Sequence, residues 1–304
     1  RGYDKRLAMG SIMGIGAVDM LIPPSALAVL LGSLALIPIS DLLIAGVIPG
    51  LVMALLFVGY IIGICIIFPE KGPIESPPEM TMWERWLPLF RDVLPLLSIF
   101  AAVVISMTSG WATPTEAAAV GAVATIAVAA AYGSFKLSGF VAALQSTATV
   151  TGAILIIIMG ATTFAQILSF SGATQGLVGT VTMLVSDRWV ILGGMILILL
   201  VLGCFIDSVS IMLITLPFFM PLVAQLGFDK VWFGIVFLIC MQFGLLSPPF
   251  GLLLFTMRSV APASVPTRDI FAAIVPYLVM LLLMVLVIIV FPGLVTWLPE
   301  ALRD

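Results

Sequence analysis

The sequence predicts an all-α protein that crosses a membrane several times. Of its 304 residues, 62% are hydrophobic and 9% are charged, whereas soluble domains contain roughly 45–50% apolar and about 25% charged residues. The charges leave long uncharged runs, and a membrane-spanning helix needs about 20 predominantly apolar residues. These runs cover residues 42–69, 93–115, 117–135, 137–186, 189–206, 208–228, 231–257 and 270–299. We therefore expect a polytopic helical membrane protein.

Charge and residue types exclude several functions. The net charge is −3 and the sequence has no basic cluster that could bind a phosphate backbone. We therefore expect no nucleic acid partner. The absence of histidine rules out a Ser-His-Asp triad, a histidine-ligated metal and a histidine proton relay. Cys65, Cys204 and Cys240 lie far apart in apolar runs, which indicates neither a disulfide framework nor a CxxC site. We expect neither an enzyme nor a resident cofactor.

Two short motifs recur at a single shift of 225 residues. Gly2-Tyr3-Asp4-Lys5 returns as Gly227-Phe228-Asp229-Lys230, and Pro23-Pro24 returns as Pro248-Pro249. The agreement of both motifs on one shift predicts a structural repeat. A long hydrophobic stretch precedes the second copy but not the first. We therefore expect this sequence to be the C-terminal part of a two-repeat protein, incomplete at its N-terminal side.

Residues 1–68 are predicted to end the first repeat, with a broken helix at 7–37 and a transmembrane helix at 42–67. Two successive prolines interrupt a helix, because proline lacks the N–H and clashes with the preceding turn. A simple kink at Pro23-Pro24 is the alternative interpretation. The matching Pro248-Pro249 favours a true break, since paired interrupted segments in two halves indicate a transporter binding site.

Residues 69–92 are predicted to form an interfacial amphipathic linker. The segment is rich in charges and prolines, which places it at a surface. Trp83, Trp86, Leu87 and Phe90 recur there at helical spacing beside charged residues. This pattern is typical of a helix that lies in the membrane interface.

Residues 93–304 are predicted to form the second repeat. Its predicted elements are helices at 93–109, 114–132 and 149–170, a re-entrant hairpin at 189–225, a broken helix at 231–260 and a C-terminal transmembrane helix at 270–297. Thr113, Pro114 and Glu116 form a capping-box pattern at the start of the second helix. The hairpin is expected to turn at 203–208, and the later break falls at 247–249.

Positive charges predict how these elements are oriented. If the first broken helix starts in the cytoplasm, nine Lys and Arg residues face the cytoplasm and three face outside. The nine are Arg1, Lys5, Arg6, Lys71, Arg85, Arg91, Lys136, Arg258 and Arg268, and the three are Arg188, Lys230 and Arg303. The same layout places the two copies of the repeated motif on opposite sides. The two repeats are therefore predicted to be inverted.

Ionisable side chains at membrane depth are candidates for function. Asp207 lies at the expected hairpin tip, before Ser208 and Ser210. An N-cap side chain and free N–H groups meet there at the positive end of a helix, where an anion could be held. Carbonyls freed at the end of the preceding helix could coordinate Na⁺. An ordinary helix cap is the alternative for Asp207.

The other candidates have structural alternatives of their own. Glu116 with Thr113 is explained by the capping box, so it is either a structural cap or part of a site. Asp19 precedes the first break and is expected to face either a cavity or a polar neighbour. Ser25 and Ser247 flank the two breaks as short oxygen donors, although Ser247 could equally be the N-cap of a helix starting at Pro248.

Five segments in series resemble the large membrane subunit of the tripartite ATP-independent periplasmic (TRAP) transporters. They are GYDKRLA, LIPPS, GWATPTEAAAVGA, FIDSVSIMLITLPFFMPL and LLSPPFGLLLF. The resemblance spans essentially the whole chain. It implies an elevator-type secondary transporter of the ion transporter superfamily, in which two inverted repeats each contain a re-entrant hairpin and a discontinuous helix. It also implies import of organic acids, such as C4-dicarboxylates, with Na⁺ across the bacterial inner membrane.

The resemblance implies partners and site residues as well. The implied partners are an extracytoplasmic solute-binding protein, a small TRAP membrane subunit and membrane lipid. The implied substrate-binding residues are Asp207, Ser208, Ser210, Pro24, Ser25 and Pro249, and the implied Na⁺ ligands are Ser25, Pro23, Asp207, Ser247 and Pro248. The sequence departs from the family in two places: a first hairpin is expected before Gly2, and Asp19 stands where relatives have a small residue.

Three other functions compete with this interpretation. A stand-alone Na⁺/carboxylate symporter or Na⁺/H⁺ exchanger of the same superfamily would need no binding protein. A membrane enzyme would need two carboxylates brought together, for which Asp19 and Asp207 are the candidates, but neither lies in a catalytic motif. A purely structural scaffold is the third alternative.

Overall fold

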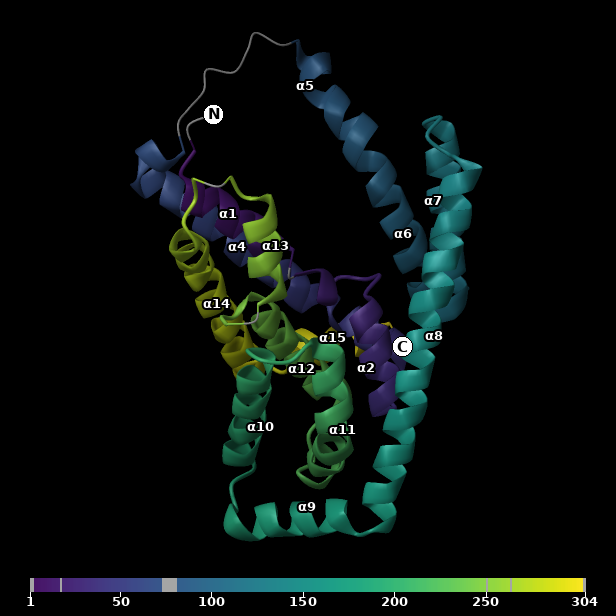
Figure 1. The fold of residues 1–304 in the computed structure, drawn as a ribbon, viewed down its shortest axis with the longest axis vertical. Helices are drawn as coiled ribbons and strands as arrows, with labels where there is room; N and C mark the ends of the chain where they lie inside the picture. The colour runs from purple at the N-terminus through teal and green to yellow at the C-terminus, as the bar shows by residue number, and fades with distance from the viewer. Residues whose placement is uncertain (1–2, 17, 73–80, 250, 263, 303–304) are drawn as a thin grey trace. The chain divides into compact units, whose positions relative to one another are not determined.

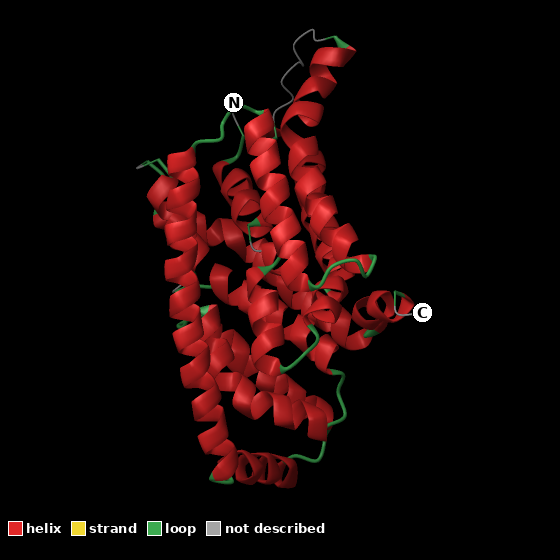
Figure 2. Ribbon diagram, turned by 90° about the vertical axis from the view of Figure 1, so that its right-hand side faces the viewer, coloured by secondary structure: helices red, strands yellow, loops and turns green. Residues whose placement is uncertain are grey.

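The computed structural model describes residues 3–16, 18–72, 81–249, 251–262 and 264–302. Within these ranges the chain consists of helices and connecting loops, and none of the described residues forms a strand (Figure 2). Six of the described helical segments are long and apolar enough to span a membrane. These are Ile39–Ile67, Met82–Met107, Pro114–Ala131, Leu137–Phe170, Ser208–Gln225 and Thr267–Val290. The predicted all-α polytopic fold is confirmed.

The chain forms two compact units (Figure 1). The first contains Arg1–Ile74 and Leu168–Asp304, and the second contains Glu75–Ile167. Each unit is described by itself.

The first unit begins with an interrupted helix. Its segments are α1 (Lys5–Ile15), the 3₁₀ turn η1 (Val18–Met20) and α2 (Ala26–Ala35). The next elements are α3 (Ile39–Ala45), α4 (Val47–Ile67) and the 3₁₀ turn η2 (Pro69–Lys71). The interruption between α1 and α2 contains Pro23-Pro24, as the sequence predicts.

Among the described residues that follow α8 (Leu137–Phe170), the first unit contains seven helices. They are α9 (Ala173–Leu184), α10 (Arg188–Gly203), α11 (Ser208–Gln225), α12 (Lys230–Leu246), α13 (Leu252–Val260), α14 (Thr267–Val290) and α15 (Gly293–Ala301). The predicted C-terminal transmembrane helix at 270–297 is present as α14, but it ends at Val290, before Pro292, and a separate helix α15 follows. A residue that precedes proline is disfavoured in the α region, and Phe291 has φ −122° and ψ 72°.

In the second unit, two further helix boundaries differ from the predicted ones. The helix predicted to be interfacial and the following span are joined end to end as α5 (Met82–Pro88), the π-helical turn η3 (Leu89–Val93) and α6 (Leu94–Thr108). Residues 73–80 of the predicted linker lie outside the described residues, and its position in the membrane interface stays a prediction. Pro88 has no N–H and therefore cannot form the usual α-helical hydrogen bond. The helix accommodates it with a wider π-helical turn and continues into α6. After α7 (Pro114–Ala131), α8 (Leu137–Phe170) starts twelve residues before the predicted 149, since no strong helix breaker lies between.

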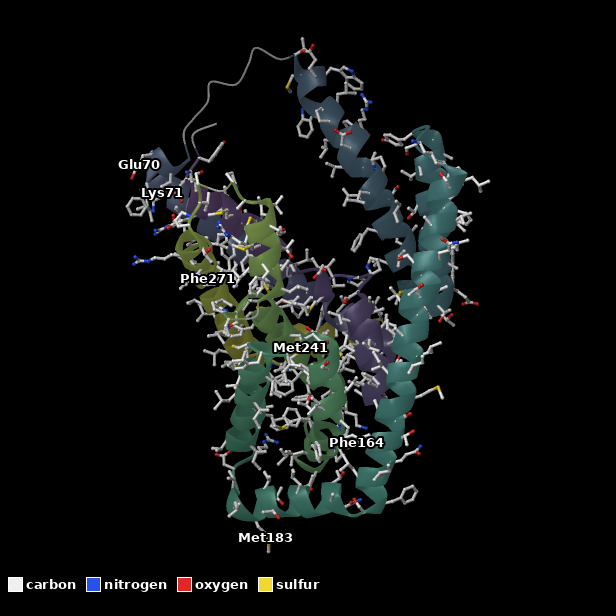
Figure 3. The ribbon with its side chains drawn as sticks, viewed as in Figure 1. Glu70, Lys71, Phe164, Met183, Met241 and Phe271 are labelled. Atoms are coloured by element: carbon white, nitrogen blue, oxygen red, sulfur yellow. The ribbon has the colours of Figure 1, made fainter. Side chains whose placement is uncertain are left out.

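The core of the first unit is built around α12. This helix is apolar on every side, which is typical of a helix buried all round, and nearly all residues from Trp232 to Leu246 are buried. Helices α2, α3, α10, α11, α13, α14 and α15 all pack against it. The indole Nε1 of Trp232 donates to the carbonyl of Ile288 on α14 at 3.1 Å. Figure 3 labels Met241, which is one of these core residues.

The two broken helices start alike. Helix α1 begins at Lys5 and α12 at Lys230, the positions that the shift of 225 relates. The Asp4 carboxylate accepts from the N–H of Leu7, and the Asp229 carboxylate accepts from that of Trp232. Both Pro-Pro peptide bonds are cis. The division into inverted repeats with the boundaries given above stays a prediction.

Candidate functional site

Asp207 caps the second arm of a helical hairpin. Helix α10 ends at Gly203 and α11 begins at Ser208, so the tip comprises residues 204–207. The Oδ2 atom of Asp207 accepts from the N–H of Ser210 at 3.0 Å, and its Oδ1 atom accepts from the Ser210 hydroxyl at 2.6 Å. The cap that the sequence predicts is present. It occupies both carboxylate oxygens and engages the Ser210 hydroxyl.

The hairpin touches the broken helix at two points, one beside its tip and one at the tip itself. A Cβ atom added to Gly244 would lie 2.7 Å from the Cα of Gly203, so the two backbones meet without side chains between them. The Sγ atom of Cys204 and the Oγ atom of Ser247 are 3.2 Å apart. These contacts bring together two segments that lie about 40 residues apart in the sequence.

A cavity of about 200 Å³ lies between the tip and the broken helix. Its polar side chains are Asp207 and Ser208, and the remaining wall is apolar or glycine. The complete lining is Gly203, Phe205, Ile206, Asp207, Ser208, Ile211, Met241, Gly244, Leu245 and Leu252. Ser210 and the residues of the first break do not line it.

Ser247 ends α12 rather than starting α13. Its N–H donates to the carbonyl of Gly244 at 3.2 Å, and α13 begins only at Leu252, after Gly251. The alternative in which Ser247 caps a helix starting at Pro248 is therefore wrong. Because residues that precede proline avoid the α region, neither Ser247 nor Pro248 can easily enter a helix.

The second break leaves carbonyl oxygens available. The carbonyl of Leu245 would receive its helical hydrogen bond from residue 249, but Pro249 has no N–H. The carbonyl oxygens of Leu245 and Ser247 each lie 3.0 Å from the position that a Cβ of Gly251 would take. Two carbonyl oxygens therefore converge beside Gly251. Oxygen ligands of this kind suit a hard cation.

The first break is organised differently. The Oγ atom of Ser25 accepts from the N–H of Ala28 at 3.2 Å and caps α2. The carbonyl of Leu21 packs against Gly46, where an added Cβ would lie 2.3 Å from that oxygen. Asp19 is exposed, and its carboxylate interacts with the backbone N–H of Met20. Pro23, Pro24 and Ser25 are not among the residues that line the hairpin cavity.

The predicted capping box of α7 is present in the second unit. The N–H of Thr113 donates to the Glu116 carboxylate at 2.7 Å, and the N–H of Glu116 donates to the Thr113 hydroxyl at 3.4 Å. Both residues are exposed. Their geometry is that of a helix cap.

Gln242 is a candidate that the sequence interpretation missed. Its side chain is fully buried in α12, and neither amide atom has a hydrogen-bond partner among the described residues. A buried unpaired polar group costs about 1–3 kcal/mol, so a bound ion, water or solute would relieve that cost. The signal was available, because Gln242 is the single long polar side chain in the uncharged run 231–257.

The described part of the chain contains no group of three His, Cys, Asp or Glu side chains that could hold a metal ion. A cation at this site would therefore depend on hydroxyl and carbonyl oxygens together with the carboxylate of Asp207. A hairpin tip that faces a broken helix inside a polytopic bundle is the arrangement of a secondary transporter.

Comparison with known proteins identifies the kind of transporter. The sequence model for the DctM component of the tripartite ATP-independent periplasmic transporters matches residues 1–294. The chain belongs to this family and is a TRAP transporter large permease subunit. It is a multi-pass membrane protein of TRAP-type solute import, and its relatives are permeases rather than enzymes.

Three relatives illustrate the similarity. The C4-dicarboxylate TRAP transporter large permease protein DctM of Pseudomonas aeruginosa is 31% identical over 300 residues, which are 98% of this chain and 69% of that protein. The sialic acid TRAP transporter large permease protein SiaM of Vibrio cholerae is 31% identical over 98% of this chain and 68% of its own length. The ectoine TRAP transporter large permease protein TeaC of Halomonas elongata is 27% identical over 98% of this chain and 69% of its own length.

Proposed function

We propose that this protein imports an organic acid, a dicarboxylate or another carboxylate, together with Na⁺ across the bacterial inner membrane. Two of its relatives are named for C4-dicarboxylates and for sialic acid, which supports an acid as substrate. The observation that carries the proposal is the approach of the hairpin tip to the second break, through Gly203 with Gly244 and Cys204 with Ser247.

Na⁺ is proposed to bind where this approach gathers oxygen atoms. The carbonyls of Leu245 and Ser247 converge beside Gly251, and the Ser247 hydroxyl lies against the tip residue Cys204. Asp207 lies with Leu245 in the wall of the hairpin cavity and adds a negative charge there. Pro248 and Pro249 contribute by denying the preceding carbonyls their helical partners.

The coupling of substrate transport to Na⁺ follows from the negative charge of Asp207. An organic anion that enters a cavity beside Asp207 meets like charge, and two unit charges 4 Å apart repel by about 4 kcal/mol at an effective dielectric constant near 20. A bound Na⁺ removes that repulsion. The anion can then use the Ser208 hydroxyl and the N–H groups at the start of α11, where the helix dipole favours negative charge.

The proposal also includes an elevator-type movement of the hairpin and the broken helices, and two protein partners. In an elevator-type mechanism the hairpin tip opens from the second break to admit Na⁺ and substrate and then closes, so that the hairpin and the broken helices move as one body. The close contact of Gly203 with Gly244 belongs to the closed arrangement. An extracytoplasmic solute-binding protein is proposed to deliver the substrate. A small membrane subunit is proposed to support the transporter, as the tripartite family implies.

Uptake by proteoliposomes tests the proposal. The full-length protein would be reconstituted with its small subunit, and uptake of labelled succinate and sialic acid would be measured with and without the cognate binding protein. We expect uptake that requires both an inward Na⁺ gradient and the binding protein. Uptake that persists after the Na⁺ gradient is replaced by K⁺ would contradict Na⁺ coupling. Uptake without the binding protein would instead support the stand-alone symporter.

A further inference from the structure

A second cavity lies at the end of the first unit where α1 and α14 begin and α4 ends. It has a volume of about 320 Å³ and shares no lining residue with the cavity at the hairpin tip. The polar side chains in its wall are those of Asp4, Arg6, Tyr60, Lys71 and Tyr277. Figure 3 shows Lys71 beside the start of α1, and the carbonyl of Lys71 accepts from the N–H of Asp4 at 3.0 Å.

Tyr277 lines this wall and carries a buried hydroxyl. Its side chain is 1% exposed, and the hydroxyl has no hydrogen-bond partner among the described residues. The ring is fixed by edge contacts with Phe57, at a centroid distance of 5.0 Å, and with Tyr60, at 5.6 Å. It also fits against Gly14, where an added Cβ would lie 2.2 Å from the ring. A rigidly held hydroxyl without a protein partner indicates a bound acceptor.

The hydrogen-bond donors around the cavity favour an anion. The Arg6 guanidinium donates to Asp269 on α14 at 2.6 Å and keeps further N–H groups available. The Lys71 ammonium lies 4.6 Å from the centroid of the Phe68 ring and forms no ion pair with a described residue. Asp4, the one carboxylate in the wall, accepts from the N–H of Leu7 as the cap of α1. Asp269 and Asp4 balance the charges of Arg6 and Lys71, so what the wall offers an anion is mainly hydrogen-bond donors from Arg6, Lys71 and the two tyrosines.

The position matches the headgroup layer of a membrane. Two of the candidate spans have their ends here, at Ile67 and Thr267. Ile67, Phe68 and Phe271 expose apolar side chains at these ends. Tyrosines are enriched at this depth, and basic pockets between membrane helices bind the headgroups of anionic lipids.

We propose that this cavity binds a phosphate group, with the headgroup of an anionic phospholipid as its source. The Tyr277 and Tyr60 hydroxyls, the Lys71 ammonium and the Arg6 guanidinium donate to the phosphate oxygens. The acyl chains lie along the exposed apolar ends of α4 and α14. The site is independent of the transport site proposed above.

The test is lipid retention by the full-length protein with its small subunit, measured by native mass spectrometry after exchange into phosphatidylcholine nanodiscs with or without phosphatidylglycerol. Tyr277→Phe keeps the packed ring and removes only the hydroxyl, while Lys71→Ala removes a charge. Lys136→Ala and Tyr132→Phe are matched controls, because neither residue lines the cavity. We expect both cavity variants to retain phosphatidylglycerol about tenfold less, as the loss of a hydrogen bond to a charged group predicts. The controls are expected to match the unmodified protein.

Two results would overturn the proposal or its lipid source. Equal retention of phosphatidylglycerol by Tyr277→Phe, Lys71→Ala and the unmodified protein would refute the site. A thermal stabilisation by inorganic phosphate in pure phosphatidylcholine that Tyr277→Phe abolishes would support the phosphate site but replace the lipid by free phosphate. Thermal unfolding of each variant identifies any loss of retention that comes from misfolding.

Discussion

The two Pro-Pro breaks have the same sequence motif but different surroundings. At the first break Ser25 caps α2, and the adjacent carbonyl of Leu21 packs against Gly46. At the second break Ser247 does not cap the next helix, α13. Its hydroxyl instead contacts the thiol of Cys204 at the hairpin tip. Gly244, which touches Gly203, corresponds to the exposed Asp19 at the shift of 225. A break thus becomes a candidate site through what packs against it, and not through its prolines alone.

The contact between Gly203 and Gly244 is where the largest effect is expected. In Gly244→Ala the new Cβ would lie 2.7 Å from the Cα of Gly203, so the hairpin must move away from the break. Overpacking of this kind costs about 1–3 kcal/mol, and we expect Na⁺-dependent uptake to be lost. Gly194→Ala, in the α10 arm that carries Gly203, is the matched control, because its new Cβ would meet nothing within 4 Å among the described residues beyond its chain neighbours and its own helix backbone. Full uptake by Gly244→Ala would show that the close approach is not required.

The charge of Asp207 is expected to have the next largest effect. Asp207→Asn retains an oxygen that can cap α11 but loses the charge, so we expect the apparent affinity for Na⁺ in uptake assays to fall about tenfold, the effect of about 1.4 kcal/mol. Asp229→Asn makes the same change at the cap of α12, away from the cavity. If the two variants had equal Na⁺ affinity, Asp207 would act only as a helix cap and not as part of the Na⁺ site.

The two serines distinguish the two breaks directly. Ser25→Ala removes a helix cap and is expected to lower the free energy of unfolding by about 0.5–2 kcal/mol. Ser247→Ala removes no cap, so we expect little change in thermal stability but a weaker Na⁺ dependence of uptake. Thermal unfolding and Na⁺ titration of uptake measure both effects. The reverse pattern would exchange the roles assigned to the two breaks.

The smallest effect is expected at the capping box of α7. Thr113→Ala removes the hydroxyl that accepts from the N–H of Glu116, so a slightly lower melting temperature is expected. Uptake should be unchanged, because the geometry of this exposed pair is that of a helix cap. A loss of uptake with intact assembly would return Glu116 to the candidate site residues.

Short sequence patterns correctly predicted the features that depend on neighbouring residues, namely the membrane helices, their interruptions and their caps. Low charge predicted the membrane helices, and the prolines predicted both interruptions. Asp207 and Thr113 cap helices as expected, because a cap involves residues within one turn of each other. The shift of 225 correctly related the starts of α1 and α12.

Packing between distant segments escaped the sequence interpretation. The contact of Gly203 with Gly244 requires two helices to meet, and neither glycine differs locally from others in the chain. The role of Ser247 depends on where α13 starts, and α13 starts only at Leu252, after Gly251. The buried amide of Gln242 was overlooked because a single glutamine in an apolar run carries no motif.

The central claim is that the hairpin tip closes on the second break during transport. Ser247→Cys would place a second thiol where the Ser247 Oγ atom now lies, 3.2 Å from the Cys204 Sγ atom. Oxidation of this variant in proteoliposomes, with and without Na⁺, measures the closure as an intramolecular cross-link between positions 204 and 247. We predict that Na⁺ accelerates the cross-link, that cross-linking stops uptake and that reduction restores it. Absence of the cross-link in Na⁺, or full uptake by the cross-linked protein, would contradict the account.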